Sequence, residues 1–434
     1  MKRRHFLRRS LGAGAGLFLP AGLLGCDGEA PPPDDSGVEV DAFRPDSGPP
    51  APFRGLSKGP YVQLVGPGRA RLRFESRIEE PFTVRLTRDG GDETPEPTLS
   101  PMELTYERDA LGMERYYPDE PGLHVVQEVI VEGLAPGEEV RWEVTPLEGE
   151  ARTGSFVAAR APDAGFRMGW LSDTSFPTAN DGIGVLAAQA PDLVLHGGDI
   201  TYQANPFDTW NHMSAAMAPL FSRAPMQLCV GNHEFENHDE ITVQYERLFA
   251  GQGDPGGDAR WFAYTYGGVR FVHVDTESGA LLEMSDTQIA WIEAELSAAA
   301  ADPDIFYPIV CFHRPTYTFS KHAPGDLSVR EYLHGRFLEH GVPLVLAGHA
   351  HCYERFAVDG ITYVVDGGGG AVTYDPDEDL EDIMRERPEE VALRQAVSRT
   401  HGVLTVDVAG DGGLTITRHE KTGDVLEVHE IPAA

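Results

Sequence analysis

The sequence predicts a small antiparallel β-sandwich followed by a larger α/β (α+β) domain, a four-layer αββα sandwich in which two stacked mixed sheets are flanked by helices. Three observations lead to this fold class. Short alternating apolar runs fill residues 53–162 with no sustained helical period. From residue 163 to 434 strands alternate with helices, and the chain ends in a series of strands. Polar residues of metal-binding type directly follow several of these strands.

Composition and charge narrow the class of protein. The chain has 434 residues, 41% of them hydrophobic, which is enough for a globular protein with more than one core. Its formal net charge is −34. Nucleic acids and anionic membrane surfaces require a basic patch, and the chain after residue 25 has none, so we expect no nucleic-acid partner.

The first 52 residues are expected to serve export. Residues 1–25 contain the basic run Lys2 to Arg9, with twin arginines, and then a weakly apolar segment too short to span a membrane, which resembles a twin-arginine signal. The segment ends in Leu-Leu-Gly-Cys and resembles a lipobox with Cys26 as the acylated residue. Residues 26–52 are rich in Pro, Asp and Gly and are predicted to be a disordered tether. We therefore expect an exported, periplasmic or cell-surface protein, anchored by lipid at Cys26.

The β-sandwich is predicted from five alternating runs separated by turn signals such as Asp89-Gly90-Gly91 and Pro136-Gly137. The runs span residues 69–74, 82–86, 125–131, 140–144 and 154–158. The stretch from Leu134 to Val140 resembles the start of a late strand in fibronectin type III domains. We therefore expect residues 53–162 to form a fibronectin type III-like sandwich.

The α/β domain is predicted from its alternating periods. Strands are expected at 167–171, 193–196, 226–230, 306–312, 344–347, 353–358, 361–366, 403–408, 414–419 and 425–430, with a hairpin at 261–275. Helices are expected at 182–189, 206–221, 241–249, from 285 onward and at 329–339. Ser285 and Gln288 have the spacing of a capping box at the start of one of these helices. The acidic segment 375–390 is expected to be a solvated excursion.

The candidate ligands all follow predicted strands, so the loops that carry them should gather at one edge of the sheets. They are Asp173, Asp199, Tyr202, Asn232, His313, His349 and His351, with His233 beside them. Two cations need a carboxylate that bridges them and terminal N and O ligands on each side. Imidazole suits borderline transition metals, and carboxylate, amide and phenolate oxygens suit harder ions. This set supplies both kinds of ligand.

In order and spacing these residues resemble the five motifs of the purple acid phosphatases, a branch of the calcineurin-like metallophosphoesterases. The motifs are Asp173, Gly198-Asp199-x-x-Tyr202, Gly231-Asn232-His233-Glu234, Val310-x-x-His313 and Gly348-His349-x-His351. The resemblance covers residues 166–370, and the preceding sandwich is similar to the N-terminal domain of that family. It implies two metal ions bridged by Asp199. Asp173, Tyr202 and His351 would complete the first site, and Asn232, His313 and His349 the second.

The resemblance also implies an activity. A hydroxide formed from metal-activated water would attack the phosphorus of a small phosphorylated substrate, as in an acid phosphatase. His233 would bind a substrate oxygen or protonate the leaving group, and His322 resembles a second outer histidine of some members. Tyr202 would hold Fe(III), with Fe(II), Zn or Mn at the second site. The first motif departs from the family at Ser175, where Gly is usual, so Ser175 either bonds phosphate or has no role there.

Alternatives remain at this stage. A phosphodiesterase or nucleotidase would need the same ligands, and a surface binding lipoprotein with a vestigial metal site is a rival from another class. Three cysteines follow Cys26, namely Cys229, Cys311 and Cys352. An odd number cannot all pair within one chain, and a bridge between two of them is left open.

Overall fold

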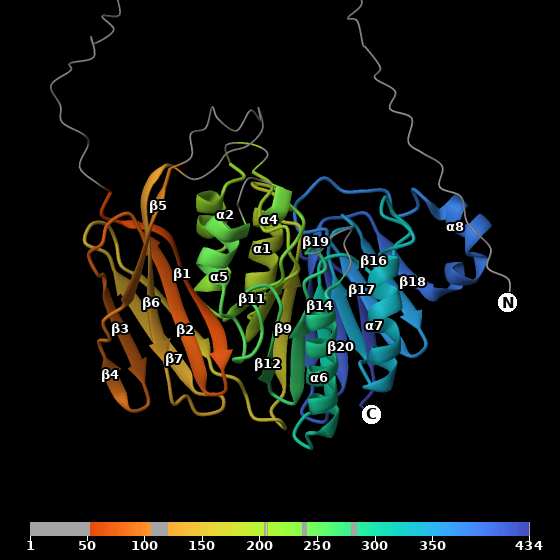
Figure 1. The fold of residues 1–434 in the computed structure, drawn as a ribbon, viewed down its shortest axis with the longest axis horizontal. Coiled ribbons are helices and arrows are strands. Elements are labelled where there is room, and N and C mark those ends of the chain that lie inside the picture. Colours follow the sequence, from red (N-terminus) through yellow and green to blue (C-terminus); the bar gives the residue numbers. More distant parts are fainter. Residues whose placement is uncertain are drawn as a thin grey trace, which may run out of the picture. The chain divides into compact units, whose positions relative to one another are not determined.

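The computed structural model describes residues 53–105, 120–203, 205, 207–236, 241–278 and 284–433. The signal peptide and tether expected over residues 1–52, with Cys26, lie outside the described residues. The described residues belong to one compact unit, drawn in colour in Figure 1. No helix within the described ranges is long and apolar enough to cross a membrane.

The N-terminal part is a sandwich of two four-stranded sheets, with strand orders β1-β2-β6-β5 and β4-β3-β7-β8. The strands are β1 (Leu56–Gly66), β2 (Arg69–Ser76), β3 (Thr83–Arg88), β4 (Gly91–Glu93), β5 (Thr98–Leu104), β6 (Gly122–Val131), β7 (Glu139–Thr145) and β8 (Arg152–Val157). Side chains such as Leu72, Phe74, Val84 and Trp142 fill the space between the sheets. The five predicted runs are all strands, and β1, β4 and β5 were not predicted. Membership of the fibronectin type III class stays a prediction.

The C-terminal part contains a six-stranded and a seven-stranded sheet. The first has the order β11-β10-β9-β19-β20-β21, and its strands are β9 (Phe166–Leu171), β10 (Leu193–His196), β11 (Met226–Leu228), β19 (Gly402–Val408), β20 (Leu414–Glu420) and β21 (Val425–Ile431). The second has the order β12-β13-β14-β15-β17-β16-β18, and its strands are β12 (Phe262–Tyr266), β13 (Val269–His273), β14 (Tyr307–Phe312), β15 (Leu344–Ala347), β16 (Tyr353–Val358), β17 (Ile361–Asp366) and β18 (Arg394–Ser398). Both sheets are mixed, as predicted. The domain boundary between residues 162 and 163 lies between β8 and β9 and stays a prediction.

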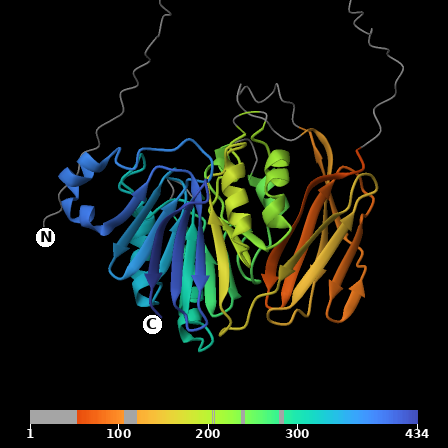
Figure 2. The same ribbon diagram turned by 180° about the vertical axis from the view of Figure 1, so that it is seen from behind.

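Three apolar cores define the four layers. The central core packs one sheet on the other through side chains such as Met168, Leu195 and Phe271. A second core places helices α1 (Ala179–Ala188), α2 (Trp210–Ala216), α3 (Ala218–Phe221) and α5 (Arg247–Phe249) on the outer face of the first sheet. A third places α6 (Asp286–Ala301) and α7 (Leu327–Glu339) on the outer face of the second (Figure 1). The αββα arrangement is therefore confirmed. The view from behind shows β19, β20 and β21 in blue beside β9 in yellow (Figure 2).

Several predicted helices differ in the structure. The helix expected at 206–221 begins only at Trp210, where the Thr209 side chain caps it by accepting from the His212 N–H. This helix ends before α3, which has Pro219 in its first turn. The helix expected at 241–249 is a π-helical turn, Ile241–Glu246, followed by α5. Ser285 does cap α6, because its hydroxyl accepts from the Gln288 N–H.

Most residues of the acidic segment 375–390 are exposed, as predicted, but the segment also has helical structure. It forms α8 (Leu380–Glu386) and the start of a 3₁₀ helix, Pro388–Leu393. Ile383 is buried against the seven-stranded sheet, and Glu390 is buried with an oxygen 2.7 Å from Arg330 Nη1. The prediction did not foresee these helices, because it considered only the acidic composition. The segment is held on the domain by Ile383 and Glu390, and also by the Asp379 N–H, which donates to the Phe319 carbonyl at 3.1 Å.

The β-sandwich docks on the four-layer domain through β1 and β2. The Tyr61 hydroxyl donates to the Leu248 carbonyl at 2.5 Å, and the Leu64 N–H donates to Gln227 Oε1 at 2.9 Å. Glu75, on β2, is fully buried among Lys58, His124 and Arg247. Because Arg247 comes from α5, this ion cluster joins the two parts.

Candidate metal centre

The candidate ligands come together where parallel strands end. Strands β9 and β10 run parallel in one sheet, and β14 and β15 run parallel in the other. The segments that follow them carry Asp173, Asp199, His313, His349 and, two residues further on, His351. Asp173, Asp199 and His313 are fully buried or nearly so. The candidate ligands therefore lie where the sequence predicted them, at the edge of the sheets where the parallel strands end.

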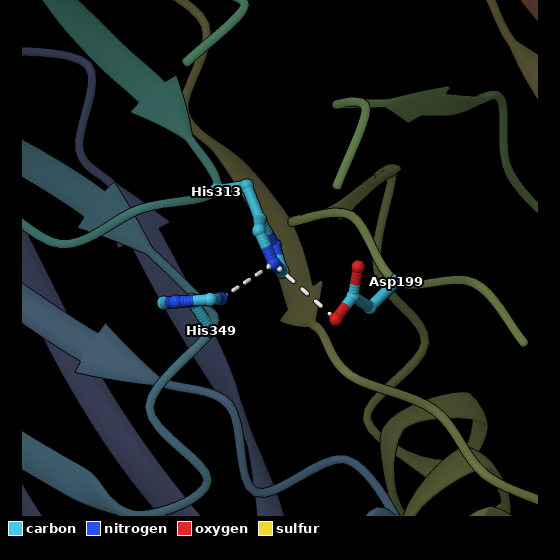
Figure 3. Close-up of side chains that lie close together, drawn as sticks. All are labelled: Asp199, His313 and His349. Carbon is cyan, nitrogen blue, oxygen red and sulfur yellow. Dashed lines mark hydrogen bonds and ion pairs between the residues drawn. The ribbon is translucent and has the colours of Figure 1, made fainter. Parts of the chain in front are cut away.

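Two groups of ligand atoms share one carboxylate. Atoms of Asp199, His313 and His349 all lie within 4.8 Å of one another, and so do atoms of Asp173, Asp199 and His351. Figure 3 shows the His313 ring between the other two members of its group, with Nε2 3.3 Å from Asp199 Oδ2 and 3.2 Å from His349 Nδ1. Asp199 is thus placed to bridge two neighbouring cation positions.

The remaining predicted ligands complete these groups. The Tyr202 hydroxyl lies 3.1 Å from Asp173 Oδ1, 3.2 Å from Asp199 Oδ2 and 2.9 Å from His351 Nε2. Asn232 Oδ1 lies 3.2 Å from His313 Nε2. Tyr202 therefore belongs with the Asp173 group and Asn232 with the His313 group, which is the division implied by the family resemblance.

The charges of the site suit cations. Burial alone would lower the pKa of His313, but the carboxylates of Asp199 and Asp173 raise it to about 10. Burial, Asp173 and Asp199 together raise the pKa of the Tyr202 phenol well above its usual value. Buried carboxylates thus attract positive charge to the same space that imidazole, phenol and amide ligands surround. This donor set fits two metal ions of the borderline to hard kind.

The backbone is strained where the ligands sit. Asp173, Asp199 and His349 have positive φ values of 58°, 52° and 67°. Residues other than glycine rarely adopt this backbone conformation, and those that do are concentrated at functional sites. A neighbouring glycine allows the close approach, because a Cβ atom at Gly231 would lie 2.2 Å from Asp199 Oδ1.

A surrounding set of hydrogen bonds orients the ligands. His313 Nδ1 lies 2.8 Å from the Gly197 carbonyl oxygen and His351 Nδ1 2.8 Å from that of Val372, so in both rings Nε2 is the nitrogen turned to the site. The His349 N–H donates to Asp173 Oδ2 at 2.9 Å. Such contacts fix the tautomer and the direction of a ligand ring.

The two outer histidines of the resemblance both border the cluster. The His233 N–H donates to Asp199 Oδ1 at 2.9 Å, and its ring centroid lies 4.2 Å from that of Tyr202. The His322 ring lies 4.0 Å from the His349 ring, centroid to centroid. Burial, with smaller effects of Lys321 and other neighbours, lowers the pKa of His322 to about 4. The structure therefore brings His322 to the site.

Three buried carboxylates that the sequence did not single out for a role support the site. Glu234 accepts hydrogen bonds from the backbone N–H groups of Asp199, Ile200 and Gly231 at 2.6–3.0 Å. Asp208 accepts from the hydroxyls of Ser175 and Thr201 at 2.9 and 2.8 Å. Ser175 is thus bonded to Asp208 in this structure. Glu277 pairs with Arg314 at 2.9 Å. Only Glu234 had a sequence signal, its place in a motif.

Tyr374 was also missed. Its ring stacks on that of His351, with centroids 4.1 Å apart and an interplanar angle of 15°. It lies in the segment after β17 that includes part of the acidic stretch, and the sequence gave no reason to bring it back to the site. Tyr374 forms part of the wall beside the Asp173 group.

Comparison with known proteins agrees with this site. The calcineurin-like phosphoesterase family matches residues 172–353, the stretch that contains all seven candidate ligands. The chain contains a calcineurin-like metallophosphoesterase domain. Purple acid phosphatase 23 of Arabidopsis thaliana is 26% identical over 306 residues, 57% of this chain and 63% of that protein. Probable inactive purple acid phosphatase 9 of the same plant is 27% identical over 206 residues, 40% of this chain and 31% of that protein. The chain spans less than two thirds of the length of these relatives.

Solved structures share the fold of the metallophosphoesterase domain. Purple acid phosphatase PPD1 from yellow lupin superposes with a TM-score of 0.69 at 18% identity, over 86% of this chain and 74% of that one. PhoD superposes with a TM-score of 0.61 at 12% identity, over 88% of this chain and 90% of that one. Because both likenesses cover more than four fifths of the chain, they include more than the metallophosphoesterase domain.

The three cysteines left open by the sequence are free and buried. Each belongs to one of the apolar cores. They act there as small apolar side chains, and burial raises the pKa of each thiol.

Proposed function

We propose that this chain hydrolyses phosphate monoesters at a dinuclear metal centre, in the manner of an acid phosphatase. The observation that carries the proposal is the pair of ligand groups that share Asp199. Asp173, Asp199, Tyr202 and His351 would hold one ion, and Asp199, Asn232, His313 and His349 the other. Two ions held in this way would activate water and neutralise charge on the phosphoryl oxygens.

The side chains of the chain itself have separate tasks in this proposal. Asp199 keeps the two ligand groups together. His233, beside Asp199 and Tyr202, is placed to hold a substrate oxygen or to pass a proton to the departing alcohol. His322, on the opposite group beside His349, can accept a hydrogen bond from the substrate.

A phosphodiesterase or nucleotidase remains the alternative within the same chemistry. Hydrolysis of a monoester such as p-nitrophenyl phosphate, a diester such as bis(p-nitrophenyl) phosphate and a set of nucleotides by the purified protein separates these activities. A non-enzymatic surface lipoprotein is the rival from another class, and the inactive label on one relative makes the assay necessary.

Asp199→Ala tests the metal-dependent mechanism. We expect loss of bound metal together with loss of hydrolysis, because both groups lose their shared ligand. Hydrolysis that survives the loss of metal would refute the proposal. A wild-type protein that binds two ions and hydrolyses none of the substrates would favour the lipoprotein.

We further propose Fe(III) in the Tyr202 group and Fe(II), Zn or Mn in the other. Protein purified without added metal should then show a visible phenolate-to-iron(III) absorption band that disappears in Tyr202→Phe. A colourless and fully active protein that contains only zinc would contradict this assignment.

The location in the cell is proposed from the N-terminal sequence alone. We propose export and lipid attachment at Cys26. Labelling with a fatty-acid probe should mark the wild type and not Cys26→Ser, and equal labelling of both would contradict the anchor.

A further inference from the structure

Arg314 lies at the edge of the candidate metal centre and has no part in the mechanism described so far. It directly follows the ligand His313 at the end of β14, and its side chain is 20% exposed. Its Nη1 lies 3.2 Å from Nε2 of His349, the ring nitrogen that faces away from His313. The guanidinium therefore borders the second ligand group.

The guanidinium is fixed on its other side. Nε and Nη2 both lie 2.9 Å from Glu277 Oε2, and the Glu277 side chain is only 2% exposed. The Thr276 hydroxyl accepts from the Arg314 N–H at 3.1 Å and donates to Glu277 Oε1 at 3.2 Å. Two of the three guanidinium nitrogens are thus held on a buried carboxylate, and only Nη1 points to the site.

The contact between Nη1 and His349 does not suit a metal-loaded site. His349 Nδ1 is the nitrogen on the side of His313 and of the shared ligand group. A neutral imidazole that gives the lone pair of Nδ1 to a cation carries its proton on Nε2. Both Nε2 and Nη1 would then be donors, so Nη1 would need another acceptor. A phosphate oxygen in the site is such an acceptor, and guanidinium is well matched to it.

We propose that Arg314, held by Glu277, binds a non-bridging oxygen of the substrate phosphate and favours monoesters over diesters. This inference rests on the proposed phosphatase function and adds a group to it. The chain carries a net charge of −34, which repels an anionic substrate at long range. A fixed cation at the site would offset this repulsion and favour binding of the substrate. A monoester offers one more non-bridging oxygen and more negative charge than a diester, and the benefit is therefore larger for the monoester.

The test measures the binding of inorganic phosphate to the metal-loaded protein by calorimetry, with metal content and visible spectrum recorded for every variant. A hydrogen bond that involves a charged group contributes about 1.5–3 kcal/mol, so Arg314→Met should raise the Kd of phosphate by about 10–100-fold. Metal content should not change. Arg314→Lys should recover part of the loss, and Glu277→Gln should raise the Kd less than Arg314→Met, because the guanidinium remains but is aimed less well.

The matched control is Arg270→Met. Arg270 is similarly buried and ion-paired, with Nη2 2.6 Å from Glu295, but it lies on β13 away from the ligand groups. We expect this control to bind phosphate with wild-type affinity. Hydrolysis gives a second measure, because kcat/KM for p-nitrophenyl phosphate should fall in Arg314→Met by about 10-fold more than kcat/KM for bis(p-nitrophenyl) phosphate.

The outcomes separate this inference from the proposed function. If the wild type hydrolyses monoesters and Arg314→Met keeps its metal and binds phosphate normally, the role of Arg314 is refuted and the phosphatase proposal stands. Loss of metal in Arg314→Met would also overturn the inference, because Arg314 would then act through His349. If the metal-loaded wild type neither hydrolyses esters nor binds phosphate, both proposals fail.

Discussion

The buried ion cluster around Glu75 is predicted to stabilise the folded protein. Lys58 Nζ lies 2.6 Å and His124 Nδ1 3.1 Å from Glu75 Oε1, and Arg247 contacts Oε2. The Glu75 side chain is completely buried. Glu75→Gln keeps the shape of the side chain but leaves the cations Lys58 and Arg247 without their counter-charge. Removing one member of a buried ion pair costs about 3–5 kcal/mol.

The expected effect on the melting temperature follows from the size of the compact unit. An unfolding entropy of about 2 cal/mol/K per residue gives about 0.8 kcal/mol/K for roughly 380 residues. The Tm of Glu75→Gln should therefore fall by about 4–6 °C near neutral pH. Scanning calorimetry and urea unfolding of the folded unit measure this change.

The stabilisation by the Glu75 carboxylate is expected to depend on pH. Burial by itself raises the pKa of Glu75, but Lys58, His124 and Arg247 together hold it well below its usual value. Because the folded-state pKa is depressed, the stabilisation is complete above the ordinary carboxyl pKa of about 4.3 and is lost as the pH falls through the folded-state value. The difference in Tm between wild type and Glu75→Gln should shrink in strong acid.

An exposed ion pair in the same part of the chain serves as the control. Arg54 and Glu80 lie 2.9 Å apart with side chains 37% and 55% exposed, so Glu80→Gln should change stability by no more than about 1 kcal/mol. Equal Tm values for Glu75→Gln and Glu80→Gln would contradict this prediction. A difference in Tm between wild type and Glu75→Gln that stays the same at every pH would also contradict it.

Three further predictions concern the site and one helix. Asp208→Asn should lower metal affinity and hydrolysis by about 10–100-fold, because Asp208 joins the two ligand-bearing loops, and unchanged metal affinity in calorimetry would contradict this. Gly231→Ala should reduce bound metal, since the added methyl would lie 2.2 Å from Asp199 Oδ1, and normal metal content by elemental analysis would show that the loop can yield. Ser285→Ala should cost about 1 kcal/mol in urea unfolding through loss of the α6 cap and leave turnover unchanged, and altered turnover would mean that α6 is coupled to the site.

The sequence determined the elements that have a clear local period. Strands β10, β15, β16 and β17 have the predicted bounds, because β10 and β15 are short apolar runs between turn signals and the turn Asp359-Gly360 separates β16 from β17. The candidate ligands could be found for a related reason. Each follows such a strand, and the ends of parallel strands meet at one edge of a sheet.

Elements whose pattern depends on distant partners could not be found in this way. Strand β1 contains Lys58 and Gln63, polar side chains that are buried only because Glu75 and Arg71 lie opposite them. The alternation of apolar and polar residues is therefore hidden in β1. The acidic segment after residue 375 is mostly exposed as predicted, but its helices were not foreseen, because Ile383 and Glu390 find their partners on other elements.

Within the site, the sequence by itself determined which residue types can bind metal and the order in which they come. The family resemblance implied the division into two groups around Asp199 and a role for His322, but only the tertiary structure shows these groups and places His322 and Tyr374 beside them. The places of Asp208 and Arg314 beside the site also follow from the tertiary structure alone. Arg314, for example, is paired with a residue 37 positions earlier. A ligand is marked by its own chemistry and its place after a strand. The role of a supporting side chain depends on what the fold places beside it.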